Sequence, residues 1–178
     1  MSSQSREDGK IKKAHREERA ASLGKPFCVW SDFLKYIFLT QQFYNDYSHC
    51  GEIERKKERP FAQVYIKANG IDFAIPLRSN INHKDYVYWT DKANKCGLDF
   101  TKAVVIEDEK YIDTTLKPYI RENEFKALLG KERDIERELL KLITDYSNAK
   151  TNPNTRLKKL LLKYSTLQYF EKYCTNES

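Results

Sequence analysis

One short segment of the chain carries side chains that could act together on a phosphodiester. It spans residues 76–84 and leaves a predicted strand, so a sheet would hold its base while its polar groups face outward. Six polar residues follow one another closely there: Arg78, Ser79, Asn80, Asn82, His83 and Lys84.

These residue types suit cleavage of RNA by internal attack of the ribose 2′-OH. That reaction needs proton transfer and stabilisation of a pentacoordinate phosphorane, but neither a metal ion nor a protein nucleophile. Arg78 can bind a phosphate through its bidentate fork and Lys84 as a point charge. Ser79 can donate to a non-bridging oxygen, and His83 can move a proton near neutral pH. The alternative is a polar hairpin exit whose asparagines satisfy the backbone.

Two residues outside this segment could complete such a site. Arg59 precedes the first strand of a predicted hairpin and is a second cation if the strands lie side by side. Tyr47 ends a predicted helix and could orient the ribose or stack on a base, although the sequence by itself favours a half-buried aromatic cap. The candidate catalytic residues are therefore Ser79, Arg78, His83, Lys84, Arg59 and Tyr47.

The charge distribution indicates where a nucleic acid would bind. The chain has a net charge of +6 and a pI near 9.0, which favours a polyanionic partner. Residues 150–173 hold six basic side chains and one acid, Glu171, whereas residues 27–149 are nearly balanced. A solvated helix face would show the same pattern. The candidate RNA-binding residues are Asn80, Asn82, Lys150, Arg156, Lys158, Lys159 and Lys163.

Metal and cofactor signatures are missing from the sequence. The four cysteines and three histidines have no C-x-x-C or H-x-x-x-H spacing, so we expect reduced cysteines, no metal site and no cofactor. Walker, GxGxxG, HExxH and GxSxG motifs are also missing. No apolar run is long enough to span a bilayer, and the charged N-terminus does not resemble a secretory signal, so we expect a soluble cytoplasmic protein.

The pattern of apolar residues predicts an α+β protein. Residues 1–24 are predicted to form a charged arm that could include a short helix at 10–21, and residues 25–174 one domain. Asn69-Gly70 predicts a type I′ turn between two strands, and Pro76 predicts a sheet edge or bulge. We expect helices at 30–47, 118–129, 131–149 and from 155 onward, and strands at 61–68, 71–77, 86–89, 102–107 and 111–113, with loops at 48–58 and 91–99.

Several of these segments resemble the toxins of type III toxin–antitoxin systems, the ToxN/AbiQ-like endoribonucleases, most closely the TenpN branch. The resemblance spans about residues 30–173. It is strongest in four segments: Arg59-Pro60-Phe61, the Asn69-Gly70 hairpin, Phe73-Ala74-Ile75-Pro76-Leu77-Arg78-Ser79, and Gly97-Leu98-Asp99-Phe100-Thr101-Lys102-Ala103-Val104-Val105-Ile106.

The resemblance implies a MazF/Kid-like fold, with a strongly twisted antiparallel sheet of about four to six strands flanked by helices. It also implies a metal-independent RNase that leaves a 2′,3′-cyclic phosphate and is inhibited by a small pseudoknot RNA cut from a repeat precursor. Toxin and RNA would form closed ring-like assemblies that act in bacterial phage defence, abortive infection or locus maintenance, with cellular or phage mRNA as the target.

The family's Pro-Leu-Thr-Ser pattern falls on residues 76–79, which makes Ser79 its best match. Arg78 stands where the family often has Thr, and Ile81 where it has a lysine, for which His83 or Lys84 could substitute. The family's basic residue before the hairpin falls on Arg59, whereas its tyrosine has no counterpart at the usual spacing, so Tyr47 is assigned from the residues alone.

Two other functions fit the same residues. One is a non-catalytic RNA-binding module that uses the basic segment 76–84 and the C-terminal helix. The other is a structural or protein-interaction domain in which the aromatic residues form the core.

Overall fold

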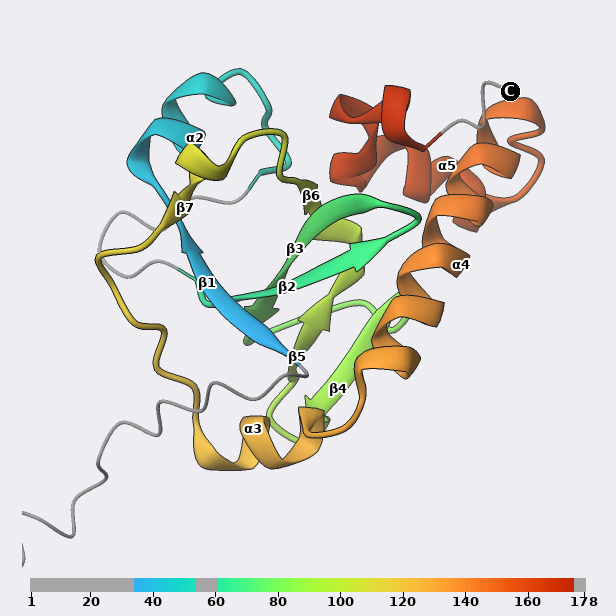
Figure 1. Cartoon of the computed structure of the whole chain (residues 1–178). Helices are drawn as coiled ribbons and strands as arrows, with labels where there is room; N and C mark the ends of the chain where they lie inside the picture. The colour runs from blue at the N-terminus through green and yellow to red at the C-terminus, as the bar shows by residue number, and fades with distance from the viewer. Residues whose placement is uncertain (1–33, 54–60, 175–178) are drawn as a thin grey trace, which may run out of the picture. The chain divides into compact units, whose positions relative to one another are not determined.

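The computed structural model describes residues 34–53 and 61–174, which belong to the unit Ser31–Ser178. This part of the chain is α+β, as predicted, and its strands form one antiparallel seven-stranded sheet in the order β4-β5-β3-β2-β1-β7, with β6 paired to β3 (Figure 1). The strands are β1 Lys35–Leu39, β2 Gln63–Ala68, β3 Ile71–Arg78, β4 Val87–Asp91, β5 Cys96–Asp99, β6 Val104–Val105 and β7 Ile112–Asp113.

The described helices surround this sheet. In Figure 1 the long helix α4 runs beside the β2–β3 hairpin and β4, and α2 lies near β1 and β7. The α-helices are α2 Gln41–Asp46, α3 Glu122–Leu128, α4 Glu132–Thr151 and α5 Arg156–Tyr164. Four 3-10 turns accompany them: η1 Phe100–Lys102, η2 Glu109–Tyr111, η3 Thr166–Tyr169 and η4 Glu171–Tyr173.

The predicted hairpin is confirmed. Strands β2 and β3 pair from Gln63↔Pro76 to Ala68↔Ile71, and the turn residues Asn69 and Gly70 have φ values of 49° and 78°. Both values are positive, as a type I′ turn requires.

Pro76 was predicted to lie at a sheet edge or a bulge, and it lies in the central strand β3 at a point where the ladder on one side is interrupted. The amide of Leu77 donates to the Ala62 carbonyl on the β2 side, so the Pro76 nitrogen faces the other side of β3. On that side β3 changes partner, from β6 at Phe73 and Ala74 to β5 at Leu77 and Arg78. The N–H that proline lacks would therefore point between β6 and β5, and its absence costs no hydrogen bond of the ladder.

We expect Gly70→Ala to lower the free energy of unfolding by about 1–2 kcal/mol, because a Cβ is strained at positive φ although no atom obstructs it. Urea denaturation would measure this change. The matched control is Gly51→Ala, which also meets open space but has no positive φ and should stay near wild type. Equal losses in the two variants would contradict a φ-specific cost.

The helix predicted for residues 30–47 is wrong over much of its described part. Residues Lys35–Leu39 form β1, which pairs with β2 and β7, and the helix begins only after Thr40, whose hydroxyl accepts from the Phe43 amide. The apolar residues of this segment fit the spacing of a helix, but they also fit that of a strand, because Ile37 and Leu39 are two apart and both buried. Pairing with strands distant in sequence decided between them.

The loop predicted for residues 91–99 is wrong at its end, where Cys96–Asp99 forms β5 between β3 and β4. The strand predicted at 102–107 shrinks to Val104–Val105, because residues Phe100–Lys102 form η1. With β5 and the confirmed short strand β7, the sheet has one strand more than the upper expectation of six.

The helices follow the predicted periodicity but not all of the predicted ends. Helix α4 agrees with its prediction, and it buries Ile135, Leu139, Leu142 and Tyr146 against the core. Helix α3 starts at Glu122 rather than at residue 118, and α5 ends at Tyr164, after which two 3-10 turns replace the expected continuation. The predicted N-cap of α5, Thr155, accepts from the Lys158 amide.

Several sequence-based expectations lie outside the described residues. They are the charged arm at 1–24 with its helix at 10–21, residue Cys28, part of the loop at 48–58, and Arg59. In the described part, no helix is long and apolar enough to cross a bilayer.

Candidate functional site

The buried carboxylate of Asp99 is the centre of the candidate site. Its side chain is fully buried, and Oδ2 accepts from Nη1 of Arg78 and lies 3.2 Å from Nε2 of His83. Its other oxygen, Oδ1, accepts from the amide and the hydroxyl of Thr101 at 3.1 and 2.6 Å. The structure thus brings together two of the predicted site residues, Arg78 and His83, on a carboxylate to which the sequence assigned no role.

Strand register explains this meeting. Arg78, at the end of β3, pairs with Gly97 of β5, so Asp99 is its diagonal neighbour on the same face of the sheet. Asp99 also caps η1 through Thr101, which holds its carboxylate in place. The loop after β3 then returns His83 to the same oxygen.

The hydrogen bonds of His83 indicate a protonated ring. Nδ1 lies 3.1 Å from the carbonyl oxygen of Asp85, which can only accept, so Nδ1 carries a hydrogen. Nε2 faces the Asp99 carboxylate, which also accepts. The hydrogen bond with Asp99 raises the pKa of His83 above its ordinary value, more than burial and the Arg78 charge lower it.

The same contacts keep Asp99 ionised. Burial by itself would raise the pKa of the Asp99 carboxyl. Hydrogen bonds from His83 and Thr101, together with the charges of His83 and Arg78, outweigh burial and lower this pKa below its usual range. With His83 protonated, the cluster holds one buried anion between two cations and carries a net positive charge.

We expect the stability of the protein to depend on His83 protonation. Since the pKa of His83 is raised on folding, its contribution is complete below the unfolded value of about 6.5 and is lost as pH rises through the folded value. We expect urea unfolding, measured from pH 5.5 to 9, to show that wild type and His83→Gln differ less in free energy of unfolding as the pH rises through the folded pKa of His83. His83→Arg, which keeps a permanent cation, should show no such loss. A pH-independent difference for His83→Gln would show that the ring does not titrate as the cation of this cluster.

The loop between β3 and β4 presents its other polar residues outward. Ser79, Asn80, Asn82 and Lys84 are exposed, whereas Ile81 between them is buried. The Ile81 amide donates to the Lys95 carbonyl at 3.1 Å, and Lys95 Nζ donates to Asn82 Oδ1 at 3.2 Å. Anchoring by Ile81 fixes the loop, so Ser79 and Lys84 stand on a supported surface beside the cluster.

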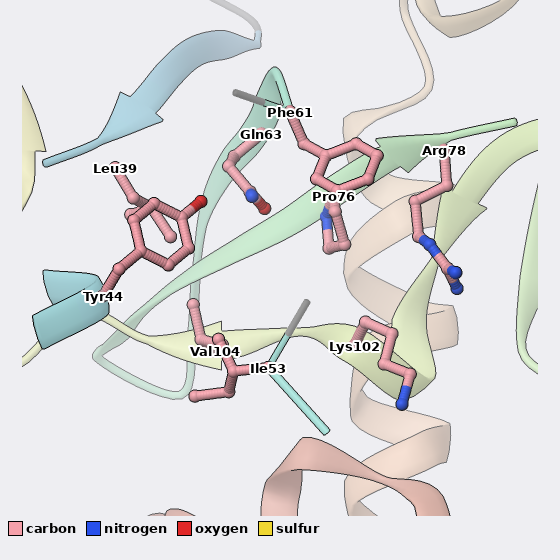
Figure 2. Close-up of a pocket in the computed structure, with 9 residues that line it drawn as sticks. All are labelled: Leu39, Tyr44, Ile53, Phe61, Gln63, Pro76, Arg78, Lys102 and Val104. Carbon is pink, nitrogen blue, oxygen red and sulfur yellow. The ribbon is translucent and has the colours of Figure 1, made fainter. Parts of the chain in front are cut away.

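A pocket next to Arg78 adds a second cation to this region. It has an empty volume of about 300 Å³, the open space at its mouth included. Arg78 and Lys102 lie together at one side of it, away from Leu39 and Tyr44 (Figure 2). The ammonium group of Lys102 also donates to the backbone carbonyl of Tyr164 at 3.0 Å. The remaining lining residues are Ile53, Phe61, Gln63, Pro76 and Val104.

Tyr47 belongs to an aromatic cluster at the edge of the core. Its ring packs on Phe43 and Phe170 at centroid distances of 4.7 and 5.3 Å, and its hydroxyl donates to Glu107 at 2.9 Å. Burial, followed by the hydrogen bond and charge of Glu107, raises the pKa of Tyr47 above its ordinary value, so it stays a phenol at neutral pH. These contacts match the alternative interpretation of Tyr47 as an aromatic cap, and its role in the site stays a prediction.

The predicted basic segment divides into paired and outward-facing residues. Lys150 forms an ion pair with Glu171, and Lys158 donates to the Asn152 carbonyl at 3.0 Å. Arg156, Lys159 and Lys163 are exposed on α5.

Two residues of the site were missed in the sequence, Asp99 and Lys102. The Asp-x-Thr spacing of Asp99 and Thr101 is a local signal for a capping turn, and it could have identified Asp99 as structurally fixed. Nothing in the sequence around Lys102 points to Tyr164 or Arg78. Lys102 meets Tyr164 because η1 packs against the C-terminal elements, and it shares a pocket with Arg78 because η1 also packs against β3.

Among residues 34–53 and 61–174, no group of three or more His, Cys, Asp or Glu side chains could hold a metal ion. Cys96 and Cys174 are buried free thiols. Comparisons with protein-family models, curated proteins and solved structures give no significant match.

Proposed function

We propose that this protein is an endoribonuclease toxin of the ToxN/AbiQ-like kind, which cuts RNA by attack of a ribose 2′-OH without a metal ion. The observation that carries the proposal is the cluster in which Arg78 and His83 meet on Asp99, with the exposed hydroxyl of Ser79 directly after Arg78. A fixed group of cations beside a hydroxyl at a strand end is suited to an anionic phosphorane.

In the proposed reaction, a bond forms between the 2′-oxygen and phosphorus while the bond from phosphorus to the 5′-oxygen breaks. The 2′-OH loses a proton and the leaving 5′-oxygen gains one, which leaves a 2′,3′-cyclic phosphate and a 5′-OH. Negative charge grows on the non-bridging oxygens as the phosphorane forms. Arg78, His83 and Lys84 would offset that charge, and Ser79 would donate a hydrogen bond to it.

The contacts of His83 favour a charge-stabilising role over that of a general base. Both ring nitrogens face protein acceptors, the Asp85 carbonyl and the Asp99 carboxylate, so the protonated ring has no lone pair available for a 2′-OH proton. Asp99 would act as a positioning residue, because it holds Arg78 and His83 in place without facing solvent itself.

The partner and the finer fold belong to the same proposal. The antiparallel sheet with flanking helices is compatible with a MazF/Kid-like toxin fold, and the exposed cations of α5 are compatible with a small RNA inhibitor. The proposed context is a bacterial cytoplasm, with the inhibitor RNA cut from a repeat precursor. Short tandem repeats followed by a terminator-like hairpin should then lie immediately upstream of the coding region.

The test is to incubate purified protein with total RNA in EDTA. We expect cleavage to persist in the chelator and to be lost in Ser79→Ala and Lys84→Ala. Both variants should fold normally, with free energies of unfolding within about 0.5 kcal/mol of wild type, because both side chains are exposed.

Three results would oppose this proposal. Intact RNA that is retained in a salt-sensitive manner would identify a non-catalytic RNA-binding module. No retained RNA would favour a structural domain. A large loss of stability in Ser79→Ala would show that the loop is structural rather than catalytic.

A further inference from the structure

Helix α5 exposes a line of apolar side chains that the described core leaves uncovered. Leu157, Leu160 and Tyr164 are 42%, 40% and 48% exposed, and their spacing places them along one stripe of the helix. Leu161, on the inner side, is buried and anchors the helix. Single exposed leucines are common, but an aligned set on a nine-residue helix indicates a binding surface.

The charges on α5 indicate the chemistry of the partner. The helix has no acidic residue, and Arg156, Lys159 and Lys163 form a basic row beside the apolar stripe. A second copy of this chain would bring the same positive charge to the contact and be repelled. A strand of unpaired RNA matches the basic row and the exposed ring of Tyr164, because its phosphates bind cations while its bases stack on exposed rings.

The end of α5 reaches the candidate site. Lys102 lines the pocket beside Arg78, and it donates to the carbonyl of Tyr164, the last residue of the helix. The 3-10 turns η1 and η3 are joined as well, because the Thr166 hydroxyl of η3 donates to the Thr101 carbonyl of η1 at 3.2 Å. The C-terminal end of α5, at the backbone of Tyr164, therefore lies next to Lys102, which lines the pocket with Arg78.

We infer that this surface, made of Lys102, Arg156, Lys159, Lys163 and Tyr164 and here called the α5 track, binds the strand of RNA that flanks the scissile phosphate. Tyr164 is the platform on which one base stacks. Lys163 Nζ lies over one face of that ring, 5.1 Å from its centre, so the base would stack on the opposite face and Lys163 would offer its charge to a neighbouring phosphate. The inference rests on the proposed function for the direction of the strand, from Arg78 toward α5.

The test uses a fluorescein-labelled single-stranded RNA with 2′-O-methyl groups, which cannot be cut because its nucleophile is blocked. By fluorescence anisotropy, we expect Tyr164→Leu to weaken binding about tenfold and Tyr164→Phe to bind as wild type does. The matched control is Tyr119→Leu, since Tyr119 is 68% exposed but lies outside the track. Lys163→Gln should reduce the slope of log K against log salt by about 0.7, as for one lost phosphate contact on a single strand.

Equal RNA affinity of Tyr164→Leu and wild type would overturn the inference. It would also be overturned if that variant lost only self-association in sedimentation or only binding to anionic vesicles. Cleavage of unmodified RNA by the wild type is measured separately. If the wild type cleaves RNA but binding does not depend on Tyr164, only the α5 track is refuted. If binding depends on Tyr164 but the wild type does not cleave RNA, the α5 track is supported and the proposed enzyme is refuted.

Discussion

Replacing Asp99 by Asn should lower the free energy of unfolding by about 3 kcal/mol, because it leaves Arg78 and His83 beside a neutral, fully buried amide. We also expect cleavage of RNA to fall about a hundredfold, since both cations lose the group that positions them. Urea denaturation and a gel-based cleavage assay in EDTA would measure the two effects.

The chain offers a matched control for this change in Asp113. Its Oδ1 accepts from the amide and the hydroxyl of Thr115 at 2.8 and 2.6 Å, the same local contacts that Asp99 makes with Thr101. Among the described side chains, no arginine or histidine forms an ion pair with Asp113, whereas Asp99 binds one of each, so Asp113→Asn isolates the cost of the local turn. Equal effects of the two variants would show that Asp99 acts only as a turn residue.

Gly97→Ala should lower the free energy of unfolding by about 3 kcal/mol or more, because the strands around β5 leave no room for a methyl group. A Cβ at this position would lie 2.3 Å from the backbone oxygen of Tyr88 and 3.1 Å from Cα of Trp89, so β4 and β5 would have to separate. Since Gly97 of β5 pairs with Arg78 of β3, a shift of β5 would also move Asp99 away from the Arg78 side chain. We therefore expect cleavage to be lost with stability.

Chemical denaturation of Gly97→Ala beside Gly51→Ala would measure this effect. A methyl group added at Gly51 would meet open space, so that variant reports the general effect of adding a side chain to a glycine. A Gly97→Ala protein as stable as the Gly51→Ala protein would mean that β4 and β5 are not in close contact at this point.

The fold could be predicted where local chemistry was decisive. The Asn69-Gly70 turn specifies its hairpin because positive φ at both positions suits few other residues. Helix α4 is specified by a long apolar stripe, and α5 by Thr155 as its cap. The prediction failed at β1 and β5, whose short sequences are compatible with a helix or a loop and become strands only through their neighbours.

The residues of the candidate site were also predicted only in part. The sequence identified Arg78, Ser79, His83 and Lys84 because they follow a clear strand within a few residues. It did not indicate that Asp99 would bind two of them, since that contact depends on the pairing of β3 with β5. His83 was predicted to move a proton, whereas both of its ring nitrogens face acceptors in the folded protein.

The amino-acid sequence by itself determined the turn, the long helices and the set of polar groups available at the end of β3. These depend on backbone preferences and apolar spacing, which act over a few neighbouring residues. Only the tertiary structure decided which acceptors the His83 ring faces, which carboxylate orients Arg78, and the approach of Lys102 to α5. Each of these joins residues from separate elements, and their distances are set by strand register and by the burial of side chains between them.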